Sequence, residues 1–150
     1  MLRMEVMVRC AQLEDKHKLT SFLQEANLGI EGIEDTIEYF LIMEDKDSSI
    51  RATLGIEPLG NFGLLRSLAM TSKASEKDLL VIFEQMLKLA REKQLQKLFL
   101  ATNKMSSLHF FSLLGFEREE QSNLPQELFQ SDHVKHILNV DNSLFMMLNL

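Results

Sequence analysis

Hydrophobic and polar positions follow two periods along the chain, one typical of strands and one typical of helices. Met4, Val6 and Val8 alternate with more polar neighbours, which predicts a strand over residues 4–10. Apolar residues three and four apart predict helices elsewhere. The predicted strands span residues 4–10, 39–43, 50–57, 64–70, 97–102, 116–118 and 144–150, and the predicted helices span 15–27, 31–37, 76–93, 106–114 and 123–129.

This order of elements predicts one α/β (α+β) domain over residues 1–150. We expect a single mixed, mostly antiparallel twisted sheet of about six to seven strands, with helices on both faces. The sequence contains no internal repeat, linker or low-complexity segment. A chain of this length buries roughly 68–70% of its unfolded surface, so it needs no disulfide or metal to fold.

Composition narrows the classes of partner. The chain carries 22 acidic and 16 basic side chains, and its net charge of −6 argues against nucleic acid. Cys10 is the single cysteine and has no partner for an internal disulfide. No apolar run approaches the ~18–20 residues of a membrane span, and the N-terminus lacks a signal-peptide core. We therefore expect a cytoplasmic protein with no membrane partner. The apolar strand 144–150 packs in the core by this prediction and is also a candidate surface for a homodimer.

The helix predicted at 76–93 begins with a capping box. The Ser75 hydroxyl can accept a hydrogen bond from the Asp78 backbone N–H, and the Asp78 carboxylate can reach back to Ser75. Lys88, Arg91 and Lys93 suit the negative pole at the other end of this helix.

Three local motifs carry a resemblance to a known family. They are LLRSLAM at 64–70 followed by a helix, LFLATN at 98–103, and HFFSLLGF at 109–116. Over nearly its whole length the chain resembles the GNAT N-acetyltransferase superfamily. The LLRSLA, FFxxLGF and LPxEL strings are most similar to small bacterial members near N-acetylglutamate synthase domains and arsenic-resistance acetyltransferases.

The resemblance implies acetyl-CoA as the acyl donor. In this family the fourth and fifth strands separate around acetyl-CoA, and its pyrophosphate rests on an R/Q-x-x-G-x-G/A loop at a helix N-terminus. By this resemblance, the backbone of Leu68, Ala69 and Met70 would bind the pantetheine arm. Asn103 would contact the pantetheine or the substrate, and Phe111 would contact the cofactor. The alternative for Asn103 is an ordinary turn residue. A helix N-terminus suits a phosphate because its N–H groups are unpaired and its pole is positive.

The sequence departs from the family pattern at this loop. The corresponding stretch, 71–80, contains no glycine and is about one residue short. Glu76 and Asp78 place carboxylates where the pyrophosphate would lie, while Lys73 and Lys77 would partly offset that charge. We therefore expect weakened or lost CoA binding, with the two lysines as the cofactor-binding side chains of this loop.

Two residues are candidates for proton transfer. By resemblance, Glu57 would deprotonate the acceptor amine, directly or through water; the alternative is a solvated glutamate at the end of a strand. His109 could act as an acid or base near neutral pH; the alternative is a partly buried histidine on a helix. Phe111 occupies the position where many family members have a tyrosine that protonates the leaving thiolate, and Tyr39 is predicted on a distant strand.

Other chemistry has weaker support in the sequence. His133 and His136 would share a helix face beside Asp132, but no third zinc ligand is identifiable, so we predict no metal site. Two functions stay open. The first is an N-acetyltransferase that moves acetyl from acetyl-CoA to the amine of a small molecule. The second is a catalytically degenerate GNAT-like domain that has lost the pyrophosphate loop and acts as a binding or interaction module.

Overall fold

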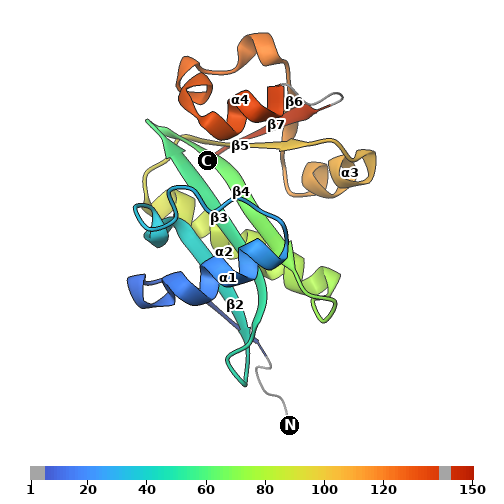
Figure 1. The fold of residues 1–150 in the computed structure, drawn as a ribbon. Coiled ribbons are helices and arrows are strands. Elements are labelled where there is room, and N and C mark those ends of the chain that lie inside the picture. Colours follow the sequence, from blue (N-terminus) through green and yellow to red (C-terminus); the bar gives the residue numbers. More distant parts are fainter. Residues whose placement is uncertain (1–5, 139–142) are drawn as a thin grey trace. The chain divides into compact units, whose positions relative to one another are not determined.

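The computed structural model describes residues 6–138 and 143–150, so Met4 and Glu5 of the first predicted strand lie outside the described residues. The strands are β1 (Val6–Cys10), β2 (Phe40–Asp45), β3 (Ile50–Leu59), β4 (Phe62–Met70), β5 (Lys97–Thr102), β6 (Glu117–Glu119) and β7 (Leu144–Asn149). The α-helices are α1 (Lys16–Glu25), α2 (Glu76–Glu92), α3 (Met105–Leu113) and α4 (Asp132–Leu138). Figure 1 shows their arrangement.

The strands of the described residues form one seven-stranded sheet in the order β1-β2-β3-β4-β5-β7-β6. Antiparallel pairs join β1 to β2, β2 to β3, β5 to β7 and β6 to β7. β4 and β5 form a parallel pair, in which Phe62–Leu64 of β4 lie beside Lys97–Phe99 of β5. The predicted mixed, mostly antiparallel sheet of six to seven strands is therefore confirmed.

The chain divides into two compact units. The first comprises the segment up to Glu57 and Arg66–Leu89, and the second comprises Pro58–Leu65 and Ala90–Leu150. The prediction of one domain over residues 1–150 stays a prediction.

In the first unit, both faces of β2 are buried. Phe40 and Ile42 point to one face, where they pack with Leu19 and Leu23 of α1. Consecutive residues of a strand point to opposite faces, and the intervening Leu41 is also buried, at 3% exposed. Figure 1 shows α1 and α2 on opposite sides of these strands. Burial on both sides explains why the first four residues of β2, Phe40–Met43, are continuously apolar rather than alternating.

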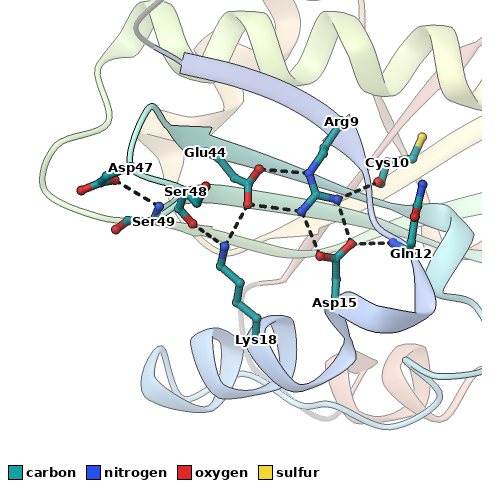
Figure 2. A network of polar contacts seen from close by, with 9 residues as sticks. All are labelled: Arg9, Cys10, Gln12, Asp15, Lys18, Glu44, Asp47, Ser48 and Ser49. Carbon is teal, nitrogen blue, oxygen red and sulfur yellow. Dashed lines mark hydrogen bonds and ion pairs between the residues drawn. The ribbon is translucent and has the colours of Figure 1, made fainter.

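A charged network ties β1, α1 and β2 together in the first unit (Figure 2). The Arg9 guanidinium donates to both carboxylate oxygens of Asp15, at 2.8 and 2.9 Å, and to Glu44 at 3.0 and 3.2 Å. Lys18 also donates to Glu44, at 2.9 Å, and to the carbonyl oxygen of Ser48. Because the bonds with Arg9 are bidentate and partly buried, they fix the start of α1 on the sheet.

The core of the second unit surrounds β5 and β7. Leu64, Phe99 and Phe145 pack together with Leu128 and Val134 from the segment between β6 and β7. β7 is hydrogen-bonded on both sides, by β5 and by β6. The core position predicted for the final strand is confirmed, and this position accounts for its apolar sequence. The homodimer stays a prediction.

One predicted helix is wrong, and another differs from the prediction in its type and bounds. Residues 31–37 form turns that lead into a 3-10 helix at Ile37–Tyr39. Gly32 in this segment has φ +75°, which a right-handed helix does not allow. Residues 123–129 divide between two 3-10 helices, Gln121–Asn123 and Gln126–Gln130, separated by the extended backbone of Leu124 and Pro125.

The turn between β3 and β4 is shorter than predicted. It comprises Gly60 and Asn61, so the strands extend to Leu59 and from Phe62. Gly60 has φ +66°, a conformation common in tight hairpins. None of the helices in the described ranges is long and apolar enough to cross a membrane.

Candidate functional site

The backbone of β4 is kinked at Ser67. This residue has φ +59°, in the left-handed region that serine rarely adopts. The hydroxyl of Thr53, which is fully buried on β3, donates a 2.9 Å hydrogen bond to the carbonyl oxygen of Ser67. The kink lies directly before the stretch from Leu68 to Met70, for which the family resemblance implies cofactor binding. Such strain is often stored at functional sites.

The residues after the kink differ in exposure. Ala69 is buried at 7% exposed, Leu68 is half-buried, and Met70 is 44% exposed. The next backbone N–H, of Thr71, donates to the carbonyl oxygen of Arg51 on β3 at 2.9 Å. The end of β4 is therefore held by β3 within the first unit.

The N-terminus of α2 has the predicted capping box. The Ser75 N–H donates to Asp78 Oδ2 at 2.9 Å, and the Asp78 N–H donates to Ser75 Oγ at 3.1 Å. Two of the N–H donors at this end of the helix are therefore satisfied by its own side chains.

Arg51 holds the capping carboxylate from the side of the sheet. Its Nη1 donates to Asp78 Oδ2 at 3.2 Å, and its Nη2 lies 2.6 Å from Asp45 Oδ1, an ion pair without hydrogen-bond geometry. Burial alone would raise the pKa of Asp78, but the hydrogen bonds from Ser75 and Arg51 outweigh it, so this pKa lies below its ordinary value. The carboxylate at the head of α2 is therefore firmly ionised.

The residues predicted to bind the pyrophosphate lie at or just before the start of α2. Glu76 and Lys77 are the first two residues of α2, so their N–H groups have no partner within the helix. The side chains of Lys73 and Lys77 are exposed, as is the Glu76 carboxylate. Lys73 contributes to lowering the pKa of Asp47, after the hydrogen bonds from Ser49. Two N–H donors and two lysines thus suit a pyrophosphate, while the carboxylates of Glu76 and Asp78 oppose it.

The remaining predicted site residues, on β3, after β5 and on α3, differ in their exposure and contacts. Glu57 is half-buried within β3, two residues before the end of that strand rather than at its end, and it has a polar or electrostatic partner. Asn103 directly follows β5 and is exposed, and His109 is exposed on α3 rather than partly buried. Phe111 is half-buried and makes edge-to-face contacts with Phe110 and Phe116, at centroid distances of 5.4 and 6.0 Å.

The two compact units divide these residues. Glu57, Leu68–Met70, Lys73 and Lys77 belong to the first unit, whereas Asn103, His109 and Phe111 belong to the second unit.

The histidines of α4 do not belong to a metal cluster. His133 and His136 are exposed on this helix, and within residues 6–138 and 143–150 no group of three or more His, Cys, Asp or Glu side chains could hold a metal ion. A polar cavity of about 410 Å³ in the second unit contains none of the predicted site residues. Its lining comprises Arg118, Glu119, Glu120, Gln121, Ser122, Ser143, Leu144 and Phe145.

Sequence reasoning missed four residues of the first unit that shape β4 and α2, namely Arg51, Thr53, Arg66 and Ser67. The arginines offered a signal, because each is a charged residue in a largely apolar strand. The kink at Ser67 has no signal of this kind, since serine rather than glycine occupies a position with positive φ.

The chain is similar to one curated protein in sequence and to several solved structures in fold. No family model matches the sequence. A protein of Bacillus subtilis strain 168, the uncharacterized protein YwlB, is 36% identical over 127 residues, which are 84% of this chain and 85% of YwlB.

Solved structures share the fold at lower sequence identity. N-acetylglutamate synthase from Neisseria gonorrhoeae, complexed with coenzyme A and N-acetyl-glutamate, matches 99% of this chain with a TM-score of 0.77 and 18% identity. The chain spans only 36% of the length of that synthase. Rv2747 from Mycobacterium tuberculosis, in complex with CoA, matches 96% of this chain and 99% of its own length, with a TM-score of 0.75 and 20% identity.

A GNAT-family acetyltransferase from Staphylococcus aureus Mu50 has a TM-score of 0.71 and 18% identity, over 97% of this chain and 99% of its own. These matches confirm the fold that the three motifs predicted. The chain therefore belongs to the same protein family as YwlB of Bacillus subtilis, and its fold is that of the GNAT acetyltransferases.

Proposed function

We propose that this protein is an N-acetyltransferase that moves the acetyl group of acetyl-CoA to the amine of a small molecule. The observation that carries the proposal is the fold match, over 96–99% of the chain, to proteins crystallised with coenzyme A. In the reaction, the neutral amine attacks the thioester carbonyl carbon, a C–N bond forms and the C–S bond breaks. The nitrogen loses a proton, and the departing CoA thiolate takes one up from water.

The first unit supplies the residues for this chemistry. The backbone N–H groups of β4 after Ser67 would polarise the thioester carbonyl, since the positive φ of Ser67 interrupts the regular strand directly before them. Glu57 on β3 would accept the amine proton, directly or through a water molecule. A half-buried glutamate is suited to this role because its carboxylate has restricted but real access to solvent.

The pyrophosphate of acetyl-CoA would lie at the start of α2. The N–H groups of Glu76 and Lys77 would donate to it, and the side chains of Lys73 and Lys77 would balance its charge. The capping carboxylate of Asp78 opposes this binding, so we expect an affinity below that of a glycine-rich loop.

An acetylation assay tests the proposal. Purified protein is mixed with acetyl-CoA and a panel of small amines, and release of the free thiol is followed over time. We expect turnover with at least one amine, and a loss of at least tenfold in kcat for Glu57→Gln. Glu84→Gln, at an exposed position in the middle of α2, is the matched control and keeps full activity. Binding of acetyl-CoA without any turnover across the panel would contradict the proposal.

The capping box favours a second candidate function. Because Ser75 and Asp78 satisfy each other and Arg51 holds Asp78 in place, the helix start does not depend on an anion for its stability. A GNAT-like domain that has lost acetyl-CoA and binds another partner is consistent with this arrangement. Absence of acetyl-CoA binding at millimolar concentration, with the fold intact, would favour this second function.

A further inference from the structure

Arg66 is a cation held by neutral groups. From its position on β4, Nη1 donates to the carbonyl oxygen of Glu31 at 3.1 Å, and Nε donates to Ser67 Oγ at 3.2 Å. Its guanidinium carbon lies 5.9 Å from the centroid of the Phe40 ring, which is fully buried. The ring and the two hydrogen bonds fix the position of a side chain that is half-buried.

The other paired cations of the first unit differ from Arg66. Arg9, Lys16, Lys18 and Arg51 each contact at least one carboxylate. Among the residues that the structure describes, Arg66 has no carboxylate partner. A guanidinium carries five N–H donors, and only two of those of Arg66 are used. The side chain therefore keeps its charge and three N–H donors for an external acceptor.

We propose that Arg66 binds a carboxylate group of the acetyl acceptor, which makes the acceptor an amino acid or a related amino carboxylate. The inference rests on the proposed function and names its substrate class. A planar carboxylate matches the two adjacent N–H groups at the end of a guanidinium. One guanidinium also balances one negative charge, whereas a phosphate carries nearly two.

The position of Arg66 in the strand supports an acceptor with closely spaced groups. Arg66 directly precedes Ser67 and the stretch Leu68–Met70, whose backbone would bind the thioester under the proposed function. In an α-amino acid the amine and the carboxylate share one carbon atom. An anchor one residue before the reacting segment therefore suits an amine and a carboxylate that are only a few ångströms apart.

Pairs of acceptors that differ only in the carboxylate test the inference. The probes are L-alanine, L-leucine and L-glutamate, each compared with its α-carboxamide in the acetylation assay. We expect a kcat/KM at least tenfold higher for one or more acids than for the matched amide. Arg66→Gln should bring that ratio toward one, mainly through KM, and Arg66→Lys should restore part of it by returning the charge. Arg91→Gln, at an exposed position near the end of α2, is the control for loss of one positive charge.

A binding measurement separates this inference from the proposed function. In protein labelled with ¹⁵N-arginine, the Nε–H signal of Arg66 is followed during titration with the same acids and amides, without acetyl-CoA. A shift with an acid but not with its amide supports the carboxylate site even if no amine is acetylated. Equal kcat/KM for acids and amides overturns the inference while the acetyltransferase stands. An Arg66 signal that no acid moves, or that inorganic phosphate moves more than every acid, also overturns it.

Discussion

The buried hydroxyl of Thr53 donates a 2.9 Å hydrogen bond to the carbonyl oxygen of Ser67, the one residue of β4 with a positive φ. This bond holds the kink in the strand directly before the backbone assigned to acetyl-CoA. A strained φ at a non-glycine residue costs on the order of 1–3 kcal/mol and persists only where its surroundings enforce it.

Thr53→Val removes this hydroxyl while keeping the shape of the side chain. The Ser67 carbonyl then loses a partner in the interior, so we expect a loss of about 1–3 kcal/mol in the free energy of unfolding. Adding Ser67→Gly should recover part of the loss, because glycine adopts positive φ without strain. Urea unfolding of the single and double variants measures both effects. If the double variant is less stable than Thr53→Val, the hydroxyl of Thr53 does not stabilise the positive φ of Ser67.

The Arg9–Asp15 pair makes stability depend on pH in the acid range. The hydrogen bond from the Arg9 guanidinium outweighs the opposing effect of burial and lowers the pKa of Asp15 to about 2. Because the pKa in the folded state lies below the unfolded value, the pair stabilises the fold fully above about pH 4, and this contribution is lost as the pH falls toward 2.

Asp15→Asn should therefore cost about 2 kcal/mol near pH 7, and the difference from the wild type should shrink as the pH falls. Glu14→Gln, an exposed neighbour in the same turn, serves as the control and should have little effect. The measurement is a series of unfolding curves from pH 7 to pH 2. A difference that stays constant over this range would be inconsistent with a charged pair as its source.

The capping box at α2 contributes to stability through one hydroxyl. Ser75→Ala removes the acceptor of the Asp78 N–H bond and should cost about 1 kcal/mol, the usual value for loss of an N-cap side chain. Ser72→Ala, at an exposed loop position three residues earlier, is the control. Thermal unfolding of both variants measures the difference. Equal melting temperatures would mean that water replaces the cap without loss.

Gly115 is required by the turn after α3. It has φ +105°, and a Cβ at this position would lie 3.2 Å from Leu148 Cδ1. Gly115→Ala should destabilise the protein by about 1–3 kcal/mol, through backbone strain and the close contact. Gly32→Asn is the matched control: this position also has a positive φ, a Cβ added there would meet no atom within 4 Å, and asparagine tolerates the conformation. A similar loss in both variants would rule out the specific contact with Leu148.

Most of the secondary structure could be predicted from the sequence, and the exceptions have identifiable causes. The strands were predictable because their apolar runs are long or alternate, and the capping box because Ser75 and Asp78 have the required spacing. The helix predicted at 31–37 was wrong because its spacing of apolar residues resembles a helix while Gly32 takes a conformation that excludes one.

The candidate site was less predictable than the fold. Glu57, Lys73 and Lys77 were named by resemblance, whereas the contacts of Arg51, Thr53 and Arg66 depend on neighbours that are distant in the sequence. Arg66 meets Glu31, which is 35 positions away, and Thr53 meets Ser67, which is 14 positions away. Without an alignment of homologues, a single sequence does not reveal such pairs.

Titration of the purified protein with acetyl-CoA in a calorimeter, with thermal unfolding as a second readout, tests the central claim most directly. The proposed acetyltransferase predicts saturable binding, and a ligand at ~100 times its Kd should add about 2.7 kcal/mol to the free energy of unfolding. Glu76→Gly combined with Asp78→Gly should tighten binding by removing both carboxylates, with Glu84→Gly as the control for glycine within α2. No heat and no stabilisation at millimolar acetyl-CoA, in the wild type and in the double variant, would contradict the proposed function.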